Sequence, residues 1–345
     1  MTRNEKSAKF LICKRIPCEI DLNSASDEKL WGEHERLSND LESARTRISQ
    51  GALSLEEMPS GGGSLLNLKV EIARRTLRRC VFCEWRCRVD RFQGTKKGAC
   101  KLGGTSLVST WFKHFGEEPP LVGSRGSGTI FFTSCTFRCV FCQNFDISQN
   151  ATNGAPVDAR NLALIIEDLR NDGALNINFV GGEPTPNLHT ILEAMNLTRV
   201  NVPMLWNSNM FCSTEAMKLL SGVIDIWLPD FKWGNDKCAV RLSKIIRYFE
   251  VVSRNHKIAH ENGDMIIRHL VMPNHVECCT KRILEWIAEN CPRALVNIMG
   301  QYHPDNEVDD HPESFPDIAR RPTRREMEEA YEYADELGII YRPVS

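Results

Sequence analysis

The sequence predicts an α/β fold: a partial (β/α)6 barrel of the TIM type with parallel strands, preceded by a Cys-rich N-terminal extension. Three observations lead to this prediction. From residue 129 onward, short apolar runs alternate with longer segments of helical periodicity. The apolar runs are rich in Val, Ile, Leu and Phe, as expected for strands buried on both faces. Six such β units joined by helices imply right-handed crossovers between parallel strands, which either close partly as a barrel or stay open as a doubly wound sheet.

The predicted strands locate the candidate site, because both architectures place their catalytic and binding residues at the carboxyl ends of the strands. Side chains that directly follow a strand are therefore the first candidates for a functional site. The six predicted strands are 129–133, 176–180, 203–206, 224–228, 265–271 and 295–299.

Helix signals lie between the predicted strands. Asp158 and Ser213 are each suited to cap the start of a helix. Thr323 and Glu326 form a capping box for the last helix. A further helix is predicted over residues 279–289, where apolar side chains recur at helical spacing. The glycines expected at helix ends are Gly173, Gly222 and Gly338.

The chain is expected to divide into three parts. Residues 1–63 form a polar extension, with a charged helix over 27–49 and a flexible linker over 59–64. Residues 64–125 form a Cys-rich metal-binding segment. Residues 126–345 form the core domain, which contains all six predicted strands.

Composition narrows the class of protein. The chain has 345 residues, 42% of them hydrophobic and 26% charged, with a net charge of −2. This near-neutral charge disfavours nucleic acid as a partner. The longest apolar runs fall far short of the roughly 20 residues of a membrane span, so no membrane partner is expected. The first ten residues lack the apolar stretch of a signal peptide, so we expect a cytoplasmic protein.

The fourteen cysteines are a high count for such a protein. Seven of them fall in two tight groups, one between residues 80 and 100 and the other between residues 135 and 142. Tight spacing without a secretion signal indicates ligands of a metal or cluster in a reducing compartment, rather than a disulfide framework.

The second of these groups follows the first predicted strand at once. Cys135, Cys139 and Cys142 are spaced as Cys-x3-Cys-x2-Cys. A 4Fe–4S cluster normally takes four thiolates, so three would leave one iron open to a small molecule with an amine and a carboxylate. The alternatives are a zinc site, which would need a fourth protein ligand, or three reduced structural cysteines.

This motif resembles the signature of the radical S-adenosylmethionine (SAM) superfamily. The end of the second predicted strand supports the resemblance, because Gly181, Gly182 and Glu183 are similar to the family segment that meets the amino group of SAM. Glycines permit close approach of backbone to a ligand, and a carboxylate accepts hydrogen bonds from an ammonium group. A plain turn is the alternative interpretation of the two glycines.

Further segments resemble the pyruvate formate-lyase activating enzyme branch of that superfamily. The resemblance implies that Asn207 and Ser208 lie near the cofactor, and that Asp230 and Lys232 form its Asp-x-Lys motif. It also implies a role for His303, after the sixth strand, near the substrate. A surface ion pair and a structural histidine are the alternatives for the last two features.

The first cysteine group supplies Cys80, Cys83, Cys87 and Cys100. Four thiols are the number that a closed zinc site or an iron–sulfur cluster requires. Structural zinc, an auxiliary cluster and unmetallated buried cysteines all remain open from the sequence. The other cysteines are interpreted as small core residues or free thiols: Cys13, Cys18, Cys212, Cys238, Cys278, Cys279 and Cys291.

The resemblance implies an oxidoreductase that carries a 4Fe–4S cluster and SAM. It would cleave SAM reductively to a 5′-deoxyadenosyl radical, which takes a hydrogen atom from a substrate. The expected partners are a one-electron donor of the flavodoxin or ferredoxin kind and a glycyl-radical enzyme or another protein substrate. The alternatives are radical modification of a small molecule and a non-catalytic iron–sulfur electron carrier or interaction protein.

Overall fold

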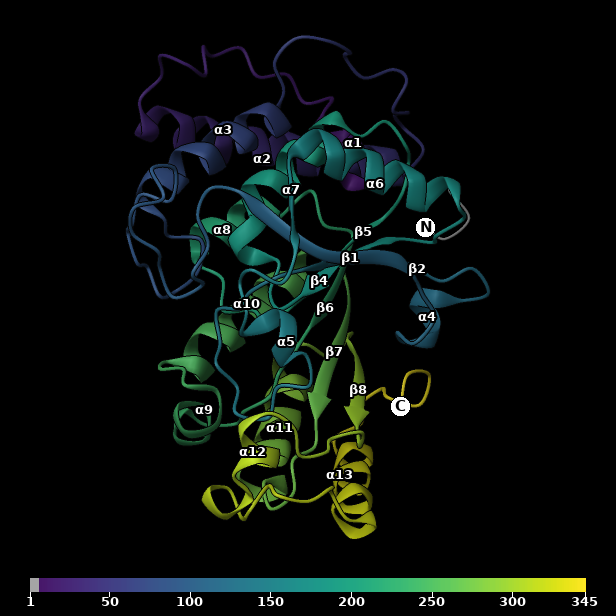
Figure 1. Cartoon of the computed structure of the whole chain (residues 1–345). Coiled ribbons are helices and arrows are strands. Elements are labelled where there is room, and N and C mark those ends of the chain that lie inside the picture. Colours follow the sequence, from purple (N-terminus) through teal and green to yellow (C-terminus); the bar gives the residue numbers. More distant parts are fainter. Residues whose placement is uncertain (1–5) are drawn as a thin grey trace.

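The computed structural model describes residues 6–345 and contains one eight-stranded sheet (Figure 1). The strand order is β3-β1-β2-β4-β5-β6-β7-β8. Strands β2 and β4 to β8 run parallel to one another, whereas β1 runs antiparallel to both β2 and β3. The strands are β1 Ser106–His114, β2 Ser127–Phe132, β3 Ala155–Val157, β4 Ile177–Gly181, β5 Met204–Ser208, β6 Ile226–Pro229, β7 Asp264–Leu270 and β8 Leu295–Met299.

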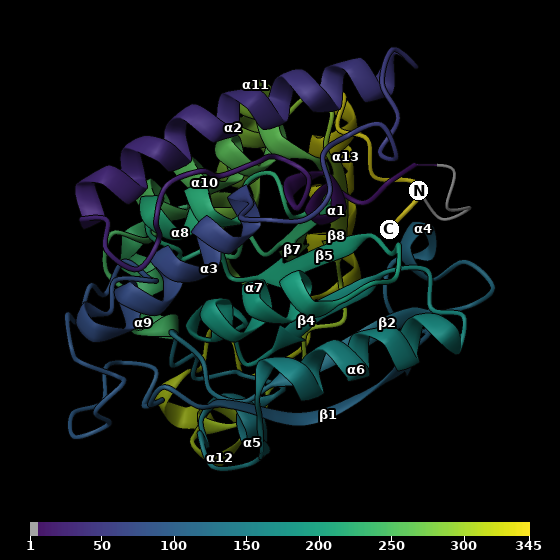
Figure 2. The same cartoon turned by 90° about the horizontal axis from the view of Figure 1, so that it is seen from above.

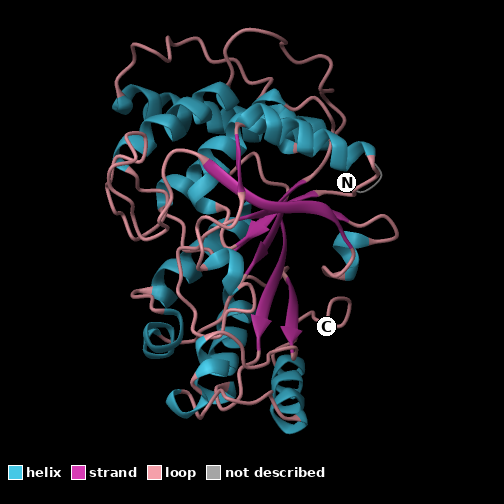
Figure 3. Ribbon diagram, in the orientation of Figure 1, coloured by secondary structure: helices cyan, strands magenta, loops and turns pink. Residues whose placement is uncertain are grey.

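Helices α1 to α3 precede the first strand, and the other helices lie between or after the strands along the chain. Figure 3 shows the helices and the strands in separate colours. The helices are α1 Lys9–Cys13, α2 Asp27–Ser49, α3 Leu65–Thr76, α4 Pro119–Val122, α5 Phe145–Ser148, α6 Ala159–Asn171, α7 Leu188–Leu197, α8 Thr214–Leu220, α9 Asp236–Ser243, α10 Tyr248–Asn262, α11 Lys281–Asn290, α12 Glu307–Asp310 and α13 Arg324–Glu336. One π-helical turn, Val276–Thr280, leads directly into α11.

The predicted α/β class and partial barrel are confirmed. Apart from the small β3, the strands from β2 to β8 have the same order in the sheet as in the chain. Each connection therefore leads to the adjacent strand, always in the same direction across the sheet. Right-handed crossovers in one direction place their helices on one face, which is the barrel arrangement rather than the doubly wound one. All six predicted strands are present, with ends that differ by up to two residues.

Two antiparallel strands were not predicted. In β1, several side chains including Trp111 and Phe112 are exposed, so the segment lacks the apolar run of a buried strand. The other strand, β3, has three residues and pairs only with β1 within the described sheet. Both add an antiparallel edge beside β2, next to the Cys135 loop.

The predicted helix caps are confirmed at three places. Asp158 accepts a hydrogen bond from the Asn161 amide at 2.8 Å, and Ser213 accepts one from Ala216 at 3.1 Å. Thr323 forms the predicted capping box with Glu326 at the start of α13. The helix expected over 279–289 differs at its start, because the π-helical turn opens it earlier.

The core has two sides, because successive strand residues point to opposite faces of the sheet. On the side of the helices, Trp206 and Trp227 are fully buried in the main apolar cluster. On the other side, Leu205, Leu228 and Ile266 form a small interior cluster with residues of α4 and the C-terminus. The interior of the barrel is therefore filled at this level.

The N-terminal extension packs onto the barrel. Helix α3 contacts α7, and α2 contacts α3, so these helices form a second layer outside the barrel helices (Figure 2). The predicted charged helix over 27–49 is present as α2. The end of the predicted linker is tied down, because the Cys18 amide donates to the Gly63 carbonyl at 3.0 Å.

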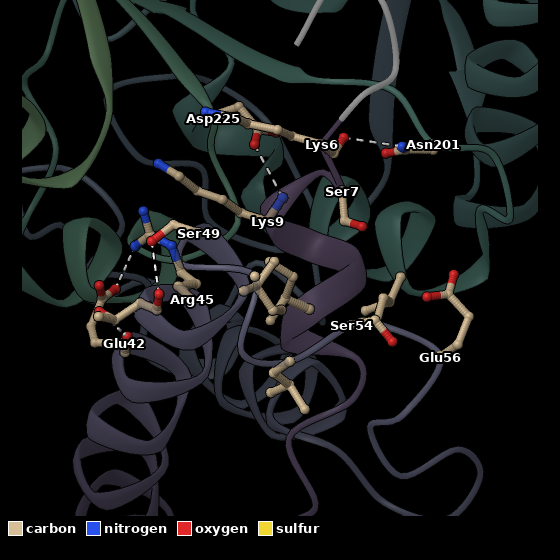
Figure 4. Close-up of a pocket in the computed structure, with 16 residues that line it drawn as sticks. Lys6, Ser7, Lys9, Glu42, Arg45, Ser49, Ser54, Glu56, Asn201 and Asp225 are labelled. Atoms are coloured by element: carbon tan, nitrogen blue, oxygen red, sulfur yellow. Dashed lines mark hydrogen bonds and ion pairs between the residues drawn. The ribbon is translucent and has the colours of Figure 1, made fainter.

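Lys9 anchors this extension to the amino ends of the strands (Figure 4). Its amide donates to Asp225 Oδ1 at 3.1 Å, and its buried ammonium donates to the carbonyl of Ile224 at 2.8 Å. Burial lowers the pKa of Lys9 to about 8. Lys9 and Asp225 line a hollow of about 830 Å³, at the end of the sheet opposite to the cysteine loop.

Within residues 6–345, none of the helices combines the length and the apolar character that crossing a membrane would require.

Candidate active site

A cavity of about 430 Å³ lies at the carboxyl ends of the parallel strands. Residues that were predicted to follow four different strands contribute to its wall. Those predicted site residues that line it are Cys135, Cys139, Cys142, Gly181, Gly182, Glu183, Asn207, Ser208, Asp230 and Lys232. The topology therefore brings into one cavity side chains that are spread over about a hundred residues of sequence.

The cysteine loop leaves β2 through Ser134, whose φ of 67° is unusual for a residue with a side chain. The Ser134 amide donates to the Ile147 carbonyl at 2.7 Å, and its hydroxyl donates to the Cys100 carbonyl. These bonds hold the turn that aims the three thiols into the cavity.

Each thiol has a polar neighbour. The Phe137 amide donates to Cys135 Sγ at 3.3 Å. Cys139 Sγ lies 3.1 Å from Ser243 Oγ, and Cys142 Sγ lies 3.1 Å from Ser148 Oγ. Hydrogen bonds to cluster sulfurs are one of the means by which proteins tune reduction potential.

The donor set fits a cluster with one open iron. Among the residues that line the cavity, the cysteines are Cys135, Cys139 and Cys142, so the cavity wall offers no fourth thiol. Cys135 and Cys139 are buried, and burial raises the pKa of the Cys139 thiol to about 12. A metal that binds there would have to displace the thiol protons, as metal sites ordinarily do.

Gly181 and Gly182 are required by packing against the strand that carries the cysteines. A Cβ at Gly181 would lie 2.1 Å from the Phe132 carbonyl oxygen, and one at Gly182 would lie 2.0 Å from that of Ser134. Gly181 also has a φ of 118°. The two glycines thus let the end of β4 approach the start of the cysteine loop, while they still line the cavity.

Glu183 joins β4 to the loop after β5. Its carboxylate accepts hydrogen bonds from Ser208 Oγ at 2.7 Å and from the Asn209 amide at 2.9 Å. Thr185 donates to it through both its hydroxyl and its amide. Burial raises the pKa of Glu183, while these hydrogen bonds act in the opposite direction. The carboxylate therefore positions the β5 loop as well as facing the cavity.

Asp230 and Lys232 form an ion pair, and Arg268 of β7 completes it. Burial acts to raise the pKa of Asp230, but the positive charges of Arg268 and Lys232 hold this pKa below its ordinary value. Arg268 also donates to Asn207 Oδ1. The Nδ2 atom of Asn207 is buried without a hydrogen-bond partner among the described residues, which leaves a donor for a ligand in the cavity.

Arg268, Glu117 and His114 also line the cavity, but they were not predicted as site residues. Arg268 Nη1 lies 3.7 Å from Glu117 Oε2, and His114 Nδ1 lies 3.5 Å from Glu117 Oε1. A signal for Arg268 was present, because it is a charged residue that directly follows the apolar residues 265–267 of β7. Glu117 and His114 belong to β1 and the turn after it, which the apolar pattern did not reveal.

His303 does not line the cavity. Its Nδ1 lies 2.9 Å from the Pro304 carbonyl, and the residues near the end of β8 that reach the cavity are Met299 and Gln301. His269, in contrast, is buried within β7 between the Phe231 carbonyl and the Thr280 hydroxyl. It has a structural role.

The second cysteine group lies beside the first. Burial raises the pKa of Cys83, and the thiols of Cys100, Cys80 and Cys87 act in the same direction, so the four lie in one neighbourhood. No three of their sulfur atoms, however, lie within 4.8 Å of one another. The segment also contacts the cysteine loop, since Arg138 Nη2 donates to the Ala99 carbonyl at 2.7 Å. The two predicted cysteine groups therefore lie next to each other in space.

Comparison with protein families identifies the core. The model of the radical SAM superfamily matches residues 129–287, from within β2 into α11. Residues 129–287 form a radical SAM superfamily domain. Membership implies a 4Fe–4S cluster and SAM as cofactors, and chemistry that depends on a SAM-derived radical. A curated relative from Methanocaldococcus jannaschii, named uncharacterized protein MJ0674, is 41% identical over 342 residues, which cover 97% of this chain and 95% of the relative.

Two proteins of known structure are similar to the chain at low identity. SuiB of Streptococcus suis, bound to its precursor peptide SuiA, is 17% identical with a TM-score of 0.44, over 61% of this chain and 46% of SuiB. TYW1 with a bound lysine–pyruvate adduct is 12% identical with a TM-score of 0.39, over 60% of this chain and 73% of TYW1. The chain thus spans less than half of SuiB.

Proposed function

We propose that this radical SAM protein is an enzyme that holds a 4Fe–4S cluster through Cys135, Cys139 and Cys142 and binds SAM in the adjoining cavity. One observation carries the proposal. Three thiols face a cavity whose wall offers no fourth cysteine, and the polar groups of four further strand ends converge on the same cavity. Three ligands and one open iron are what SAM requires for chelation through its amine and carboxylate.

When bound, the reduced cluster and SAM supply a 5′-deoxyadenosyl radical that takes a hydrogen atom from the substrate. The chain's own residues bind, orient and shield these groups. Asn207, through its unpartnered amide, and the Asp230–Lys232 pair offer both donors and acceptors to the cofactor. Phe137 and Phe141 are buried in the cavity wall beside the thiols, where they exclude water.

The test is the Cys139→Ala variant after anaerobic reconstitution with iron and sulfide. We expect the wild-type chain to form 5′-deoxyadenosine and methionine from SAM on reduction, and the variant to form neither. Cys291→Ala is a matched control, because Cys291 is also buried but lies at the end of α11, outside the cavity. A SAM-cleaving cluster in Cys139→Ala would overturn the assignment.

The group Cys80, Cys83, Cys87 and Cys100 is proposed as a second metal centre next to the first, either an auxiliary cluster or zinc. Its place against the cysteine loop supports a role in electron delivery or in folding of that lobe. A one-electron donor of the flavodoxin or ferredoxin kind is the proposed partner. Iron and zinc counting in a Cys83→Ala variant distinguishes the two metals, and unchanged contents of both would exclude a centre there.

Activation of a glycyl-radical enzyme is the more specific candidate. It is supported by the resemblance of Asp230 and Lys232 to the Asp-x-Lys motif of activating enzymes, and by their shared place in the cavity. His303 belongs to this candidate alone, as a residue proposed to act near the substrate. Incubation with candidate partners should produce the doublet electron paramagnetic signal of a glycyl radical. SAM cleavage without that signal would favour another protein or a small molecule, and a cluster without SAM cleavage would favour an electron carrier.

A further inference from the structure

Four metal-ligating side chains converge outside the active-site cavity. Cys238 lies in α9, whereas His275, Cys278 and Cys279 lie in and just before the π-helical turn that leads into α11. Their donor atoms all lie within 4.8 Å of one another, and no other group of three or more His, Cys, Asp or Glu residues in residues 6–345 meets that spacing. The sequence had suggested only core residues or free thiols here, because Cys238 is 37 residues from His275.

Four of the six distances between these atoms match those around one tetrahedral ion. Cys278 Sγ lies 3.9 Å from Cys238 Sγ and 3.8 Å from Cys279 Sγ. His275 Nδ1 lies 3.5 Å from Cys238 Sγ and 3.3 Å from Cys278 Sγ. Zinc at about 2.3 Å from sulfur and about 2.0 Å from nitrogen in a tetrahedron requires separations of about 3.8 Å between sulfurs and about 3.5 Å between nitrogen and sulfur. Sulfurs this far apart form no disulfide, which needs about 2.05 Å.

The histidine is oriented as a metal ligand. Its Nε2 lies 3.1 Å from Asp317 Oδ2, and Asp317 is held in turn by Arg241. Arg241 Nη2 also lies 3.5 Å from the same ring nitrogen. When the carboxylate accepts a hydrogen bond from Nε2–H, the Nδ1 lone pair faces the sulfurs. This is the carboxylate–histidine–zinc arrangement of known sites.

The backbone around the cluster is shaped for close approach. A Cβ at Gly234, just before α9, would lie 2.7 Å from the Cys279 carbonyl oxygen and 2.8 Å from the Cys279 Cα. Asn235, the N-cap of α9, donates to the Cys278 carbonyl at 2.8 Å, and its Nδ2 lies 3.5 Å from Cys279 Sγ. Single π-helical turns are rare and occur frequently at functional sites.

We propose that Cys238, His275, Cys278 and Cys279 bind one zinc ion in a closed structural site. Four protein ligands leave no position for a substrate, which distinguishes structural from catalytic zinc. Cys238, His275 and Cys279 are buried and Cys278 is half-buried, so the ion would be enclosed by the chain. The site is separate from the thiols of the active-site cavity.

The zinc would fix a helix that supports the cluster loop. At the other end of α9, the Ser243 carbonyl accepts from the Arg138 amide at 3.1 Å, and the Leu242 carbonyl accepts from the Val140 amide at 2.9 Å. Ser243 Oγ also contacts Cys139 Sγ. Zinc at the start of α9 therefore stabilises the position of the loop that carries Cys139.

The first experiment counts zinc. The full-length chain is purified under reducing, anaerobic conditions, stripped with a chelator, given Zn²⁺ alone, desalted and analysed for bound zinc. We expect Cys278→Ser to hold one zinc per chain less than the wild type, and the control Cys291→Ser to hold as much as the wild type. Asp317→Asn should weaken zinc binding about tenfold or more, measured by competition with a chromophoric chelator. Equal zinc contents of Cys278→Ser and wild type would overturn the proposal.

A second measurement uses the wild-type chain and does not depend on the folding of any variant. The cysteines are alkylated with and without Zn²⁺, and the modified peptides are quantified by mass spectrometry. Zn²⁺ should protect Cys238, Cys278 and Cys279 together, with Cys278 showing the largest change because it is the most exposed of the three. Equal alkylation with and without Zn²⁺, or a Cys238–Cys278 disulfide in the reduced preparation, would exclude the zinc site.

Discussion

Arg268 pairs with Asp230 in the wall of the active-site cavity: its Nη2 and Nε lie 2.9 and 3.0 Å from the same carboxylate oxygen, Oδ1. The other carboxylate oxygen pairs with Lys232. Through a third contact, to Asn207, the same guanidinium links the ends of β5, β6 and β7. One planar side chain therefore sets the relative position of polar groups from three strands.

Replacing Arg268 by Lys should impair the reaction more than the fold. A lysine keeps the charge, but its single ammonium cannot reproduce the forked contacts with Asp230 and Asn207. Misplacement of such groups by about 1 Å can cost about 100-fold in rate, so we expect a loss of that order in 5′-deoxyadenosine formation. Iron content should remain at the wild-type level, and Arg324→Lys, a change on the exposed face of α13, should leave the rate unchanged. An unaltered rate in Arg268→Lys would remove Arg268 from the site.

Replacing Glu183 by Gln should destabilise the chain. One carboxylate oxygen accepts hydrogen bonds from the Thr185 and Ser208 hydroxyls, and the other accepts one from the Asn209 amide. In glutamine, one of these two oxygens is replaced by an NH₂ group, which would face a hydrogen-bond donor. A buried polar group left unsatisfied costs about 1–3 kcal/mol. The midpoint of denaturant unfolding should fall accordingly, whereas Glu193→Gln, at a partly exposed ion pair, should change it little. Equal midpoints for Glu183→Gln and wild type would show that the carboxylate charge is not needed there.

Buried neutral histidines should make the fold sensitive to acid. Burial lowers the pKa of His269 to about 4, and that of His256 also to about 4. Below pH 6.5, which is near the ordinary histidine pKa, the unfolded chain takes up protons that the folded chain excludes. The free energy of unfolding should therefore fall from pH 6.5 toward pH 4, by about 1.4 kcal/mol per pH unit for each such proton.

His269→Gln tests the sign and size of this effect. A glutamine amide can donate a hydrogen bond to the Phe231 carbonyl and accept one from the Thr280 hydroxyl. The variant can therefore replace both hydrogen bonds of His269. Between pH 6 and pH 4.5, the free energy of unfolding should depend less steeply on pH in the variant. The difference in slope should be about 1.4 kcal/mol per pH unit, which corresponds to one proton. The exposed His311 provides the control variant His311→Gln, whose slope should match the wild type. A slope unaffected by His269→Gln would contradict the assignment.

Removing the Lys9 ammonium should loosen the N-terminal extension. Lys9→Met leaves the Ile224 and Asn262 carbonyls without their buried donor, at a cost of about 1–3 kcal/mol. Limited proteolysis should then cut the first sixty residues faster than in the wild type. Lys29→Met, on the exposed side of α2, should be cut at the wild-type rate. Identical cleavage of both variants would mean that other contacts hold the extension.

The parts of the fold that follow from local patterns were predictable. The apolar runs of β2 and β4 to β8, and the caps at Asp158, Ser213 and Thr323, depend on residues within a few positions of one another. The cysteines of the cavity were predictable for the same reason. Strand β1 was not, because its exposed side chains follow no apolar period.

Features that depend on tertiary contact were not predictable. Arg268 becomes a site residue only when β5, β6 and β7 lie side by side, and its role is invisible in a single strand. The Cys238 and His275 cluster likewise joins α9 to the turn before α11. The role of Gly182 was predicted only in part, because the close contact with Ser134 requires the pairing of β2 with β4.

Helix α9 has only eight residues, yet one end meets the zinc ligands and the other end carries hydrogen bonds to the cysteine loop. This geometry has a consequence for how the holoprotein matures. If zinc enters first, the loop that receives iron is already shaped before any cluster arrives, and iron loading of a zinc-free chain should be slower and less complete. The order in which the two metals are delivered would then decide how much of the newly made protein becomes active.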